Sequence, residues 1–171
     1  AREIVIALIG ACVAVKRTPS FASHPSLYHN LSVANMYLKS AELLIGGWMS
    51  GDVAQLLSFG GPAHLCFRPP EALTGNTVDN ETALTWMIGV TFYSLLFSRP
   101  PFEPRTVKEA IELSRETGGV NLKFPNNKTV SSQARSLLMR TLEFDPGKRI
   151  SLTGLLEDPY FGMEKKKRFP V

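Results

Sequence analysis

The polar segment at residues 28–35, YHNLSVAN, lies between two apolar stretches and holds residue types from which an active-site loop is built. It contains no carboxylate. Asn30 cannot be a general base near neutral pH, because its amide oxygen is barely basic. His29 can accept a proton, although a single loop histidine is more often a hydrogen-bonded or exposed bystander. As an active-site loop, the segment would therefore depend on His29 or lack a proton acceptor.

Two apolar segments, residues 4–15 and 84–97, must supply most of the frame that holds this loop. Each is well short of the roughly 20 residues that a membrane span requires, so both are predicted to be helices buried inside protein. The second is apolar on nearly all sides, which places it at the centre of a domain. The first helix, over residues 3–16, starts almost at residue 1 without a cleavage site, so we expect the chain to open in mid-domain.

Shorter elements follow from local signals. Residues 36–38 and a piece near Trp48 and Met49 predict a small β-hairpin. Thr106 and Glu109 form a capping box before a helix that is expected to reach about Ser114.

Two serines predict further helix starts. Ser132 is expected to cap one helix, and Ser151 a last short one.

Composition narrows the class of protein. With 171 residues, 44% of them hydrophobic, the chain can build one packed domain. The net charge of +4 depends heavily on the run at residues 165–168, which indicates a solvated tail and no nucleic-acid partner. Cys12 and Cys66 lack the spacing of a metal site and are predicted to be buried free thiols.

Three stretches, in this order, resemble the larger, carboxy-terminal lobe of protein kinases. CFRPPEAL at 66–73 is similar to the family's alanine-proline-glutamate motif, and WMIGVTFYSLLFSRPPF at 86–102 to its tryptophan-x-x-glycine-valine helix. ARSLLMRTLEFDPGKRISLTGLLEDPYF at 134–161 resembles the closing helices. The resemblance implies a mainly α fold, a helical bundle around a buried central helix with a small β-hairpin near the cleft. It would occupy residues 1–162, without the amino-terminal lobe, and a basic tail would follow at 163–171.

The same resemblance implies a buried ion pair. In kinases the glutamate of the closing motif pairs with an arginine of the late helices, and these residues are Glu71 and Arg149 here. Loss of one partner would leave a buried charge uncompensated, at a cost of roughly 3–5 kcal/mol. Trp86 and Phe92 are expected to be packing groups of the central helix that bind nothing.

The resemblance also places residues 28–35 on the kinase catalytic loop, whose usual form is His-Arg-Asp-Leu-x-x-x-Asn. Aligned from Asn35, which matches a magnesium ligand, Asn30 takes the position of the aspartate that accepts the substrate proton. Ser32 takes the position at which many kinases carry a phosphate-steering lysine. Leu84 stands where kinases carry an aspartate that braces the loop backbone, so base and brace are both missing.

The second magnesium ligand has two candidate positions. Gly46 preserves a spacing of 11 from Asn35 (46 − 35) but supplies no carboxylate. Asp52, at a spacing of 17 (52 − 35), supplies one and requires a hairpin loop lengthened by about four residues at 39–45. We prefer Asp52.

These features favour a pseudokinase lobe that acts as an interaction or allosteric scaffold for a protein partner. Joined to an amino-terminal lobe, it would still bind ATP and magnesium through Asp52 and Asn35. One alternative is an active ATP-dependent serine/threonine kinase with an atypical loop, in which His29 or no residue is the base. The other is an unrelated helical binding domain.

A narrower resemblance concerns the origin of the protein. The strings at 51–53 (GDV) and 61–63 (GPA), with the degraded loop, look like the rhoptry kinase-like proteins of apicomplexan parasites. This resemblance would imply a secreted effector that passes from a secretory organelle into the host cell.

Overall fold

The structure is a computed structural model that describes residues 2–16, 36–39, 42–45, 62–76, 78–126 and 129–161. Two strands lie among these residues, β1 (Met36–Lys39) and β2 (Glu42–Ile45). The described helices are α1 (Arg2–Lys16), η3 (Pro62–Phe67), α4 (Pro70–Leu73), α5 (Asn80–Phe97), α6 (Val107–Thr117), η4 (Gly119–Asn121), α7 (Ser132–Thr141), α8 (Leu152–Leu156) and η5 (Pro159–Phe161). The fold is thus mainly α, a helical bundle with one small hairpin, as predicted.

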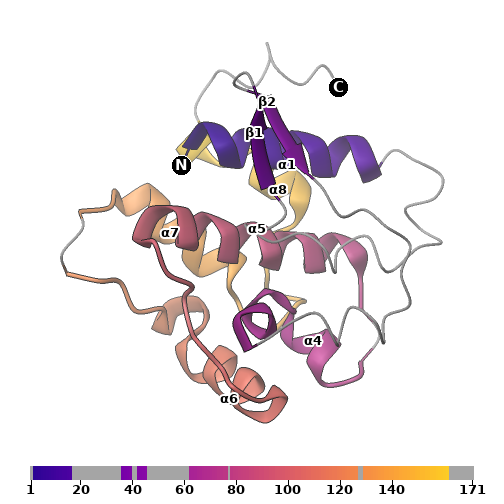
Figure 1. The fold of residues 1–171 in the computed structure, drawn as a ribbon, viewed down its shortest axis with the longest axis vertical. Coiled ribbons are helices and arrows are strands. Elements are labelled where there is room, and N and C mark those ends of the chain that lie inside the picture. The colour runs from indigo at the N-terminus through magenta and orange to yellow at the C-terminus, as the bar shows by residue number, and fades with distance from the viewer. Residues whose placement is uncertain are drawn as a thin grey trace.

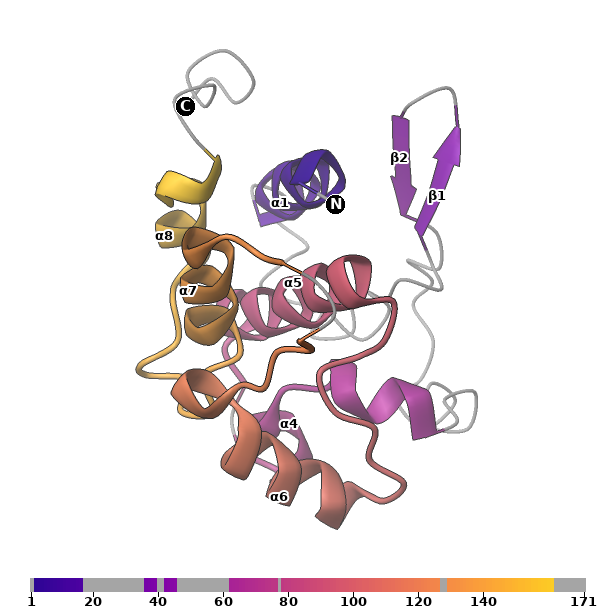
Figure 2. The same cartoon turned by 90° about the vertical axis from the view of Figure 1, so that its left-hand side faces the viewer.

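Helix α5 is the central element. Figures 1 and 2 show it crossing the middle of the molecule, between α1 on one side and α6 on the other. Helices α1, α7, α8 and η3 all pack against it. Every residue from Ala83 to Tyr93 is buried, since the helix has no polar face to turn toward solvent. Asp79 begins the helix by accepting a 2.9 Å hydrogen bond from the Thr82 amide.

Helix α1 confirms the amino-terminal helix expected over residues 3–16. Val5, Leu8, Ile9 and Cys12 are buried at helical spacing, and the helix packs on α5 and α8. In the part of the chain that the structure describes, no helix is both long enough and apolar enough to cross a bilayer.

The hairpin differs from the prediction in its second strand. Strands β1 and β2 are antiparallel, with Met36 opposite Ile45 and Lys39 opposite Glu42, so only residues 40 and 41 connect them. The partner of β1 is therefore residues 42–45 and not the piece near residues 48–49, which lies outside the described residues, and the loop lengthened within 39–45 is wrong. A two-residue connection lets the apolar run that follows it pair directly with β1.

Two helix starts also correct the prediction in detail. At α6, Thr106 accepts a 3.1 Å hydrogen bond from the Glu109 amide as expected, but the Glu109 carboxylate accepts from the Arg105 amide, at 2.8 Å. At α7 the capping residue is Ser131, whose hydroxyl accepts from the Ala134 amide at 3.2 Å, and Ser132 is the first helical residue. Helix α6 continues to Thr117, past the predicted end.

Helices α5 and α7 approach closely at a glycine. A methyl group at Gly89 would come within 2.5 Å of the Thr141 hydroxyl oxygen and 3.0 Å of Leu142 Cδ2. Because glycine has no side chain, the central helix can contact the carboxyl end of α7 at position 89.

Candidate functional site

The site residues named from the sequence divide into two groups. The structure brings Glu71 and Arg149 together. The others lie outside the described residues, as does the basic tail at 163–171; they are His29, Asn30, Ser32, Asn35 and Asp52.

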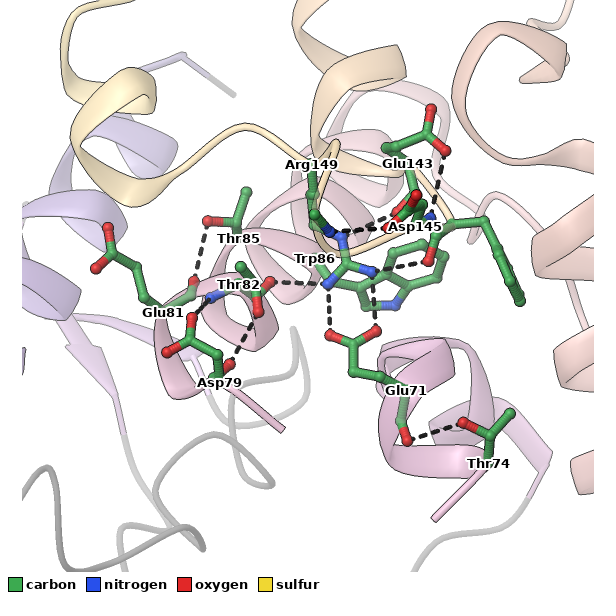
Figure 3. Close-up of polar contacts among 12 residues, drawn as sticks. Glu71, Thr74, Asp79, Glu81, Thr82, Thr85, Trp86, Glu143, Asp145 and Arg149 are labelled. Atoms are coloured by element: carbon green, nitrogen blue, oxygen red, sulfur yellow. Dashed lines mark hydrogen bonds and ion pairs between the residues drawn. The ribbon is translucent and has the colours of Figure 1, made fainter. Parts of the chain in front are cut away.

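Glu71 and Arg149 form a bidentate ion pair between α4 and the segment before α8 (Figure 3). Arg149 Nη1 lies 2.7 Å from Glu71 Oε1, and Nη2 lies 2.9 Å from Oε2. The two side chains are 0% and 4% exposed. Pro70 starts α4 and places Glu71 in its first turn, where the helix dipole favours a carboxylate.

Three main-chain carbonyl oxygens accept hydrogen bonds from the remaining N–H groups of Arg149. Nε donates to the Glu143 carbonyl at 2.9 Å, Nη2 to Phe144 at 3.3 Å and Nη1 to Thr82 at 3.0 Å. All five N–H groups of the guanidinium are then satisfied, which is the condition for burying this cation at tolerable cost. The arginine joins α4, the start of α5 and the segment after α7.

Trp86 on α5 supports this pair from the other side. Its ring centre lies 5.0 Å from the Arg149 guanidinium carbon, within range of a cation–π contact. The indole nitrogen donates to the Cys66 carbonyl oxygen at 3.0 Å, and the residue is fully buried. The sequence predicted Trp86 only as a packing group, because a main-chain acceptor 20 positions away leaves no signal in side-chain types.

Leu84, two residues before Trp86 on α5, is 1% exposed and belongs to the apolar core. Its side chain has no polar atom, so it accepts no backbone hydrogen bond. Whatever holds a catalytic loop against this point of α5 must do so by packing or through other acceptors.

The hairpin bears on the two candidate positions for a magnesium ligand. Asn35 directly precedes β1 and Gly46 directly follows β2, and the Met36–Ile45 pair closes this end of the ladder. The hairpin lacks the lengthened loop on which the Asp52 placement depended, while Gly46 and Asp52 themselves lie outside the described residues. Among the residues that the structure describes, no cluster of three or more His, Cys, Asp or Glu side chains is suited to a metal ion.

The two cysteines are buried free thiols, as predicted. Burial raises the pKa of Cys12 and of Cys66 from 9.0 to about 12 in each case. Both sulfurs stay protonated at neutral pH, so neither is an active nucleophile.

Comparison with known proteins gives matches over most of the chain. Residues 62–161, more than half of it, match the protein kinase domain family. "Aurora kinase A-A" of Xenopus laevis is 32% identical over 158 residues, which are 84% of this chain and 37% of that protein. "Aurora kinase C" of Mus musculus is 30% identical over 154 residues, 83% and 52% of the two chains.

A third relative is a plant protein. "Probable serine/threonine-protein kinase CCRP1" of Zea mays is 32% identical over 143 residues, 77% of this chain and 22% of that protein. The chain spans about half, or less, of the length of the curated relatives that it matches.

Proposed function

The chain belongs to the protein kinase domain family, and from this premise we propose that it is a pseudokinase lobe that acts as an interaction and allosteric scaffold. Family membership excludes the unrelated helical domain considered from the sequence. It also accounts for the buried pair Glu71–Arg149, to which we assign a structural role.

One feature of the sequence carries the proposal: aligned from Asn35, the carboxamide of Asn30 falls at the position where kinases hold the proton-accepting aspartate. An amide does not titrate near neutral pH, so general-base catalysis from this position is lost. The buried, apolar Leu84 supports the same conclusion, because the loop also lacks the carboxylate that would fix its backbone.

Nucleotide binding is a separate part of the proposal. Kinases use ATP with magnesium, and in this chain Asn35 and Asp52 are the residues that would hold the ion, with Ser32 close to the phosphates. The unlengthened hairpin argues for the alternative placement at Gly46, which would supply no carboxylate to the ion. We therefore expect weak nucleotide binding at most.

A phosphotransfer assay tests the proposal. The full-length protein, with any amino-terminal lobe, is incubated with labelled ATP, magnesium and generic protein substrates, beside an Asp52→Ala variant. We expect no transfer above that variant. Robust turnover that disappears in Asp52→Ala would overturn the pseudokinase proposal and restore Asp52 as a metal ligand.

An active serine/threonine kinase is the second candidate. The printed names of the relatives, which describe kinases, favour it. Much of phosphoryl transfer is positioning and electrostatic stabilisation, so a residual rate without a carboxylate base is physically reasonable. If such a rate exists and His29 is the base, His29→Ala abolishes it; full activity in this variant excludes the histidine mechanism.

The location of the protein is also proposed. The strings at 51–53 and 61–63 are the basis for a rhoptry kinase-like secreted effector that reaches the host cell. Immunofluorescence of the tagged full-length protein in its native cell tests this, and a signal that never leaves the cytoplasm contradicts it.

A further inference from the structure

The carboxyl end of α5 carries a cluster of aromatic rings. Tyr93 and Phe97 pack at 4.5 Å between ring centres, and Phe124, from the segment between η4 and α7, lies 6.3 Å from Tyr93 and 6.1 Å from Phe97. Tyr93 and Phe97 are buried, and Phe124 is partly exposed. The cluster is a rigid base for the side chains above it.

Three cations surround this cluster. Burial raises the pKa of the Tyr93 phenol and the nearby Arg99 cation lowers it, and the Tyr93 hydroxyl donates to the Lys123 carbonyl oxygen at 2.8 Å. The Arg135 guanidinium carbon lies 4.8 Å from the centre of the Phe124 ring. Arg99 and Lys123 are thus neighbours of Tyr93, and Arg135 is a neighbour of Phe124; we refer to these three residues as the basic surface.

No acid neutralises the basic surface within the described part of the chain. The ion pairs there involve Lys108, Arg140, Lys148 and Arg149, and none of the three surface cations. Residues 82–102 and 117–142, which contain all three, have no Asp or Glu at all. Three unpaired cations held near each other favour an anionic ligand.

The cations also keep their donors available. A cation–π contact uses the face of the Arg135 guanidinium and leaves its N–H edge free for a carboxylate. Arg99 and Lys123 are exposed, and Arg135 is partly so. Stacking fixes the guanidinium plane in advance, so less side-chain entropy is lost when an anion binds.

An exposed apolar side chain lies shortly before Lys123 in the chain. Val120, three residues before Lys123, is 80% exposed. Its turn is anchored, because the Gly119 amide donates to the Leu142 carbonyl at 2.7 Å and the Leu122 amide donates to Gly119 at 3.1 Å. A fixed, exposed valine three residues from an unpaired lysine suits a ligand with both acidic and apolar side chains.

The number of cations and the exposed valine help to distinguish between an acidic peptide and a lipid surface as the anionic partner. Clusters that bind lipid headgroups have about 4–8 basic residues. Within the described part of the chain this face has three cations and the exposed Val120, which fit a short peptide better. We infer that the basic surface and Val120 bind an acidic, partly apolar peptide segment of a protein partner, an inference that rests on the proposed scaffold function.

Fluorescence anisotropy on the full-length protein tests this inference. The probe is a short labelled peptide of Asp, Glu and Leu, and an Asn, Gln and Leu peptide of equal length is the neutral comparison. The triple variant Arg99→Gln, Lys123→Gln, Arg135→Gln should raise the Kd for the acidic peptide by about tenfold or more. Arg115→Gln is the matched control, since Arg115 stacks 5.2 Å from the Phe144 ring, and should leave the Kd within about twofold.

Two further measurements complete the test. Val120→Ser should weaken binding of the acidic peptide without changing the salt dependence of its Kd. Thermal unfolding of each variant shows that the fold is retained. Equal binding of the acidic and neutral peptides, or an unchanged Kd in the triple variant, overturns the inference. So does tighter binding of duplex RNA or of anionic vesicles that depends on the same three cations.

The result is independent of the phosphotransfer assay. Absent peptide binding together with absent phosphotransfer overturns the role of the basic surface and leaves the pseudokinase proposal standing. Asp52-dependent phosphotransfer overturns the pseudokinase proposal, whatever the peptide does.

Discussion

The Trp86 indole donates a hydrogen bond to the Cys66 carbonyl oxygen while its ring supports the Arg149 guanidinium. One side chain of the central helix therefore holds both η3 and the buried ion pair. Helix η3 leads directly into α4, which carries Glu71. The tryptophan therefore contacts both the segment before α4 and the arginine with which Glu71 pairs. Residues 66–73, which resemble the alanine-proline-glutamate motif of kinases, are therefore held in place by α5 as well as by Arg149.

Removing either charge of the pair should destabilise the lobe strongly. Arg149→Leu leaves the Glu71 carboxylate buried without a partner, and we expect the free energy of unfolding to fall by about 3–5 kcal/mol. Glu71→Gln is the milder variant, since the amide can still accept from Arg149. Urea denaturation measures both changes.

Exchanging the two charges should not restore stability. The variant Glu71→Arg, Arg149→Glu would place a carboxylate against the three carbonyl oxygens that now accept from Arg149. We expect it to be no more stable than the single variants, whereas replacing both residues by leucine recovers part of the loss. Full recovery on exchange would show that the carbonyl contacts contribute little.

The serine that caps α7 can be identified by substitution. Ser131→Ala should lower the free energy of unfolding by about 1 kcal/mol, because the Ala134 amide loses its acceptor. Ser132→Ala, one residue along, should change it by less than about 0.5 kcal/mol, because this exposed serine caps nothing. Equal effects in thermal unfolding would contradict the assignment.

A methyl group at Gly89 should separate α5 from α7. Gly89→Ala forces a contact with Thr141, and we expect a loss of about 1–3 kcal/mol. Adding Thr141→Ala removes the obstructing atoms and should return part of that loss. Gly75→Ala is the contrasting variant: the space beside it is open but its φ is +74°, so its cost of about 1 kcal/mol should not respond to Thr141→Ala.

The buried thiols predict a loss of stability in alkali. Unfolded thiols deprotonate above pH 9.0, whereas the folded thiols remain protonated up to their pKa of about 12. The free energy of unfolding should therefore be unaffected by the thiols below pH 9 and fall between pH 9 and 12, by about 1.4 kcal/mol per pH unit for each thiol. Urea titrations at several pH values, on the natural protein and on the double variant Cys12→Ala, Cys66→Ala, isolate this contribution. If the free energy of unfolding depends on pH in the same way in both proteins, the prediction is disproved.

The central helix could be predicted because its composition is unambiguous. Residues 84–97 are apolar on every side, and only the middle of a domain can accommodate such a helix. Glu71 and Arg149 were found through a family motif, since nothing local relates residues so far apart. The bonds from Arg149 and Trp86 to carbonyl oxygens could not be predicted, because every residue has a carbonyl group.

The errors arose where neighbouring residues offered equal local signals. Ser131 and Ser132 are both suitable caps, and only the backbone path decides which hydroxyl faces the free amide of Ala134. In the hairpin, the piece near Trp48 and Met49 is short enough for a strand, but pairing with β1 after a two-residue connection selects residues 42–45. Most of the candidate catalytic positions lie outside the described residues, so their chemistry still rests on residue type.

The 78 positions between Glu71 and Arg149 also set an order of events during synthesis. The ribosome releases the glutamate long before the arginine, so the nascent chain must close a long loop before this carboxylate finds its counter-ion. Until Arg149 has emerged, α4 lacks this counter-ion, so the segment that carries the arginine decides when α4 is fixed in its native arrangement.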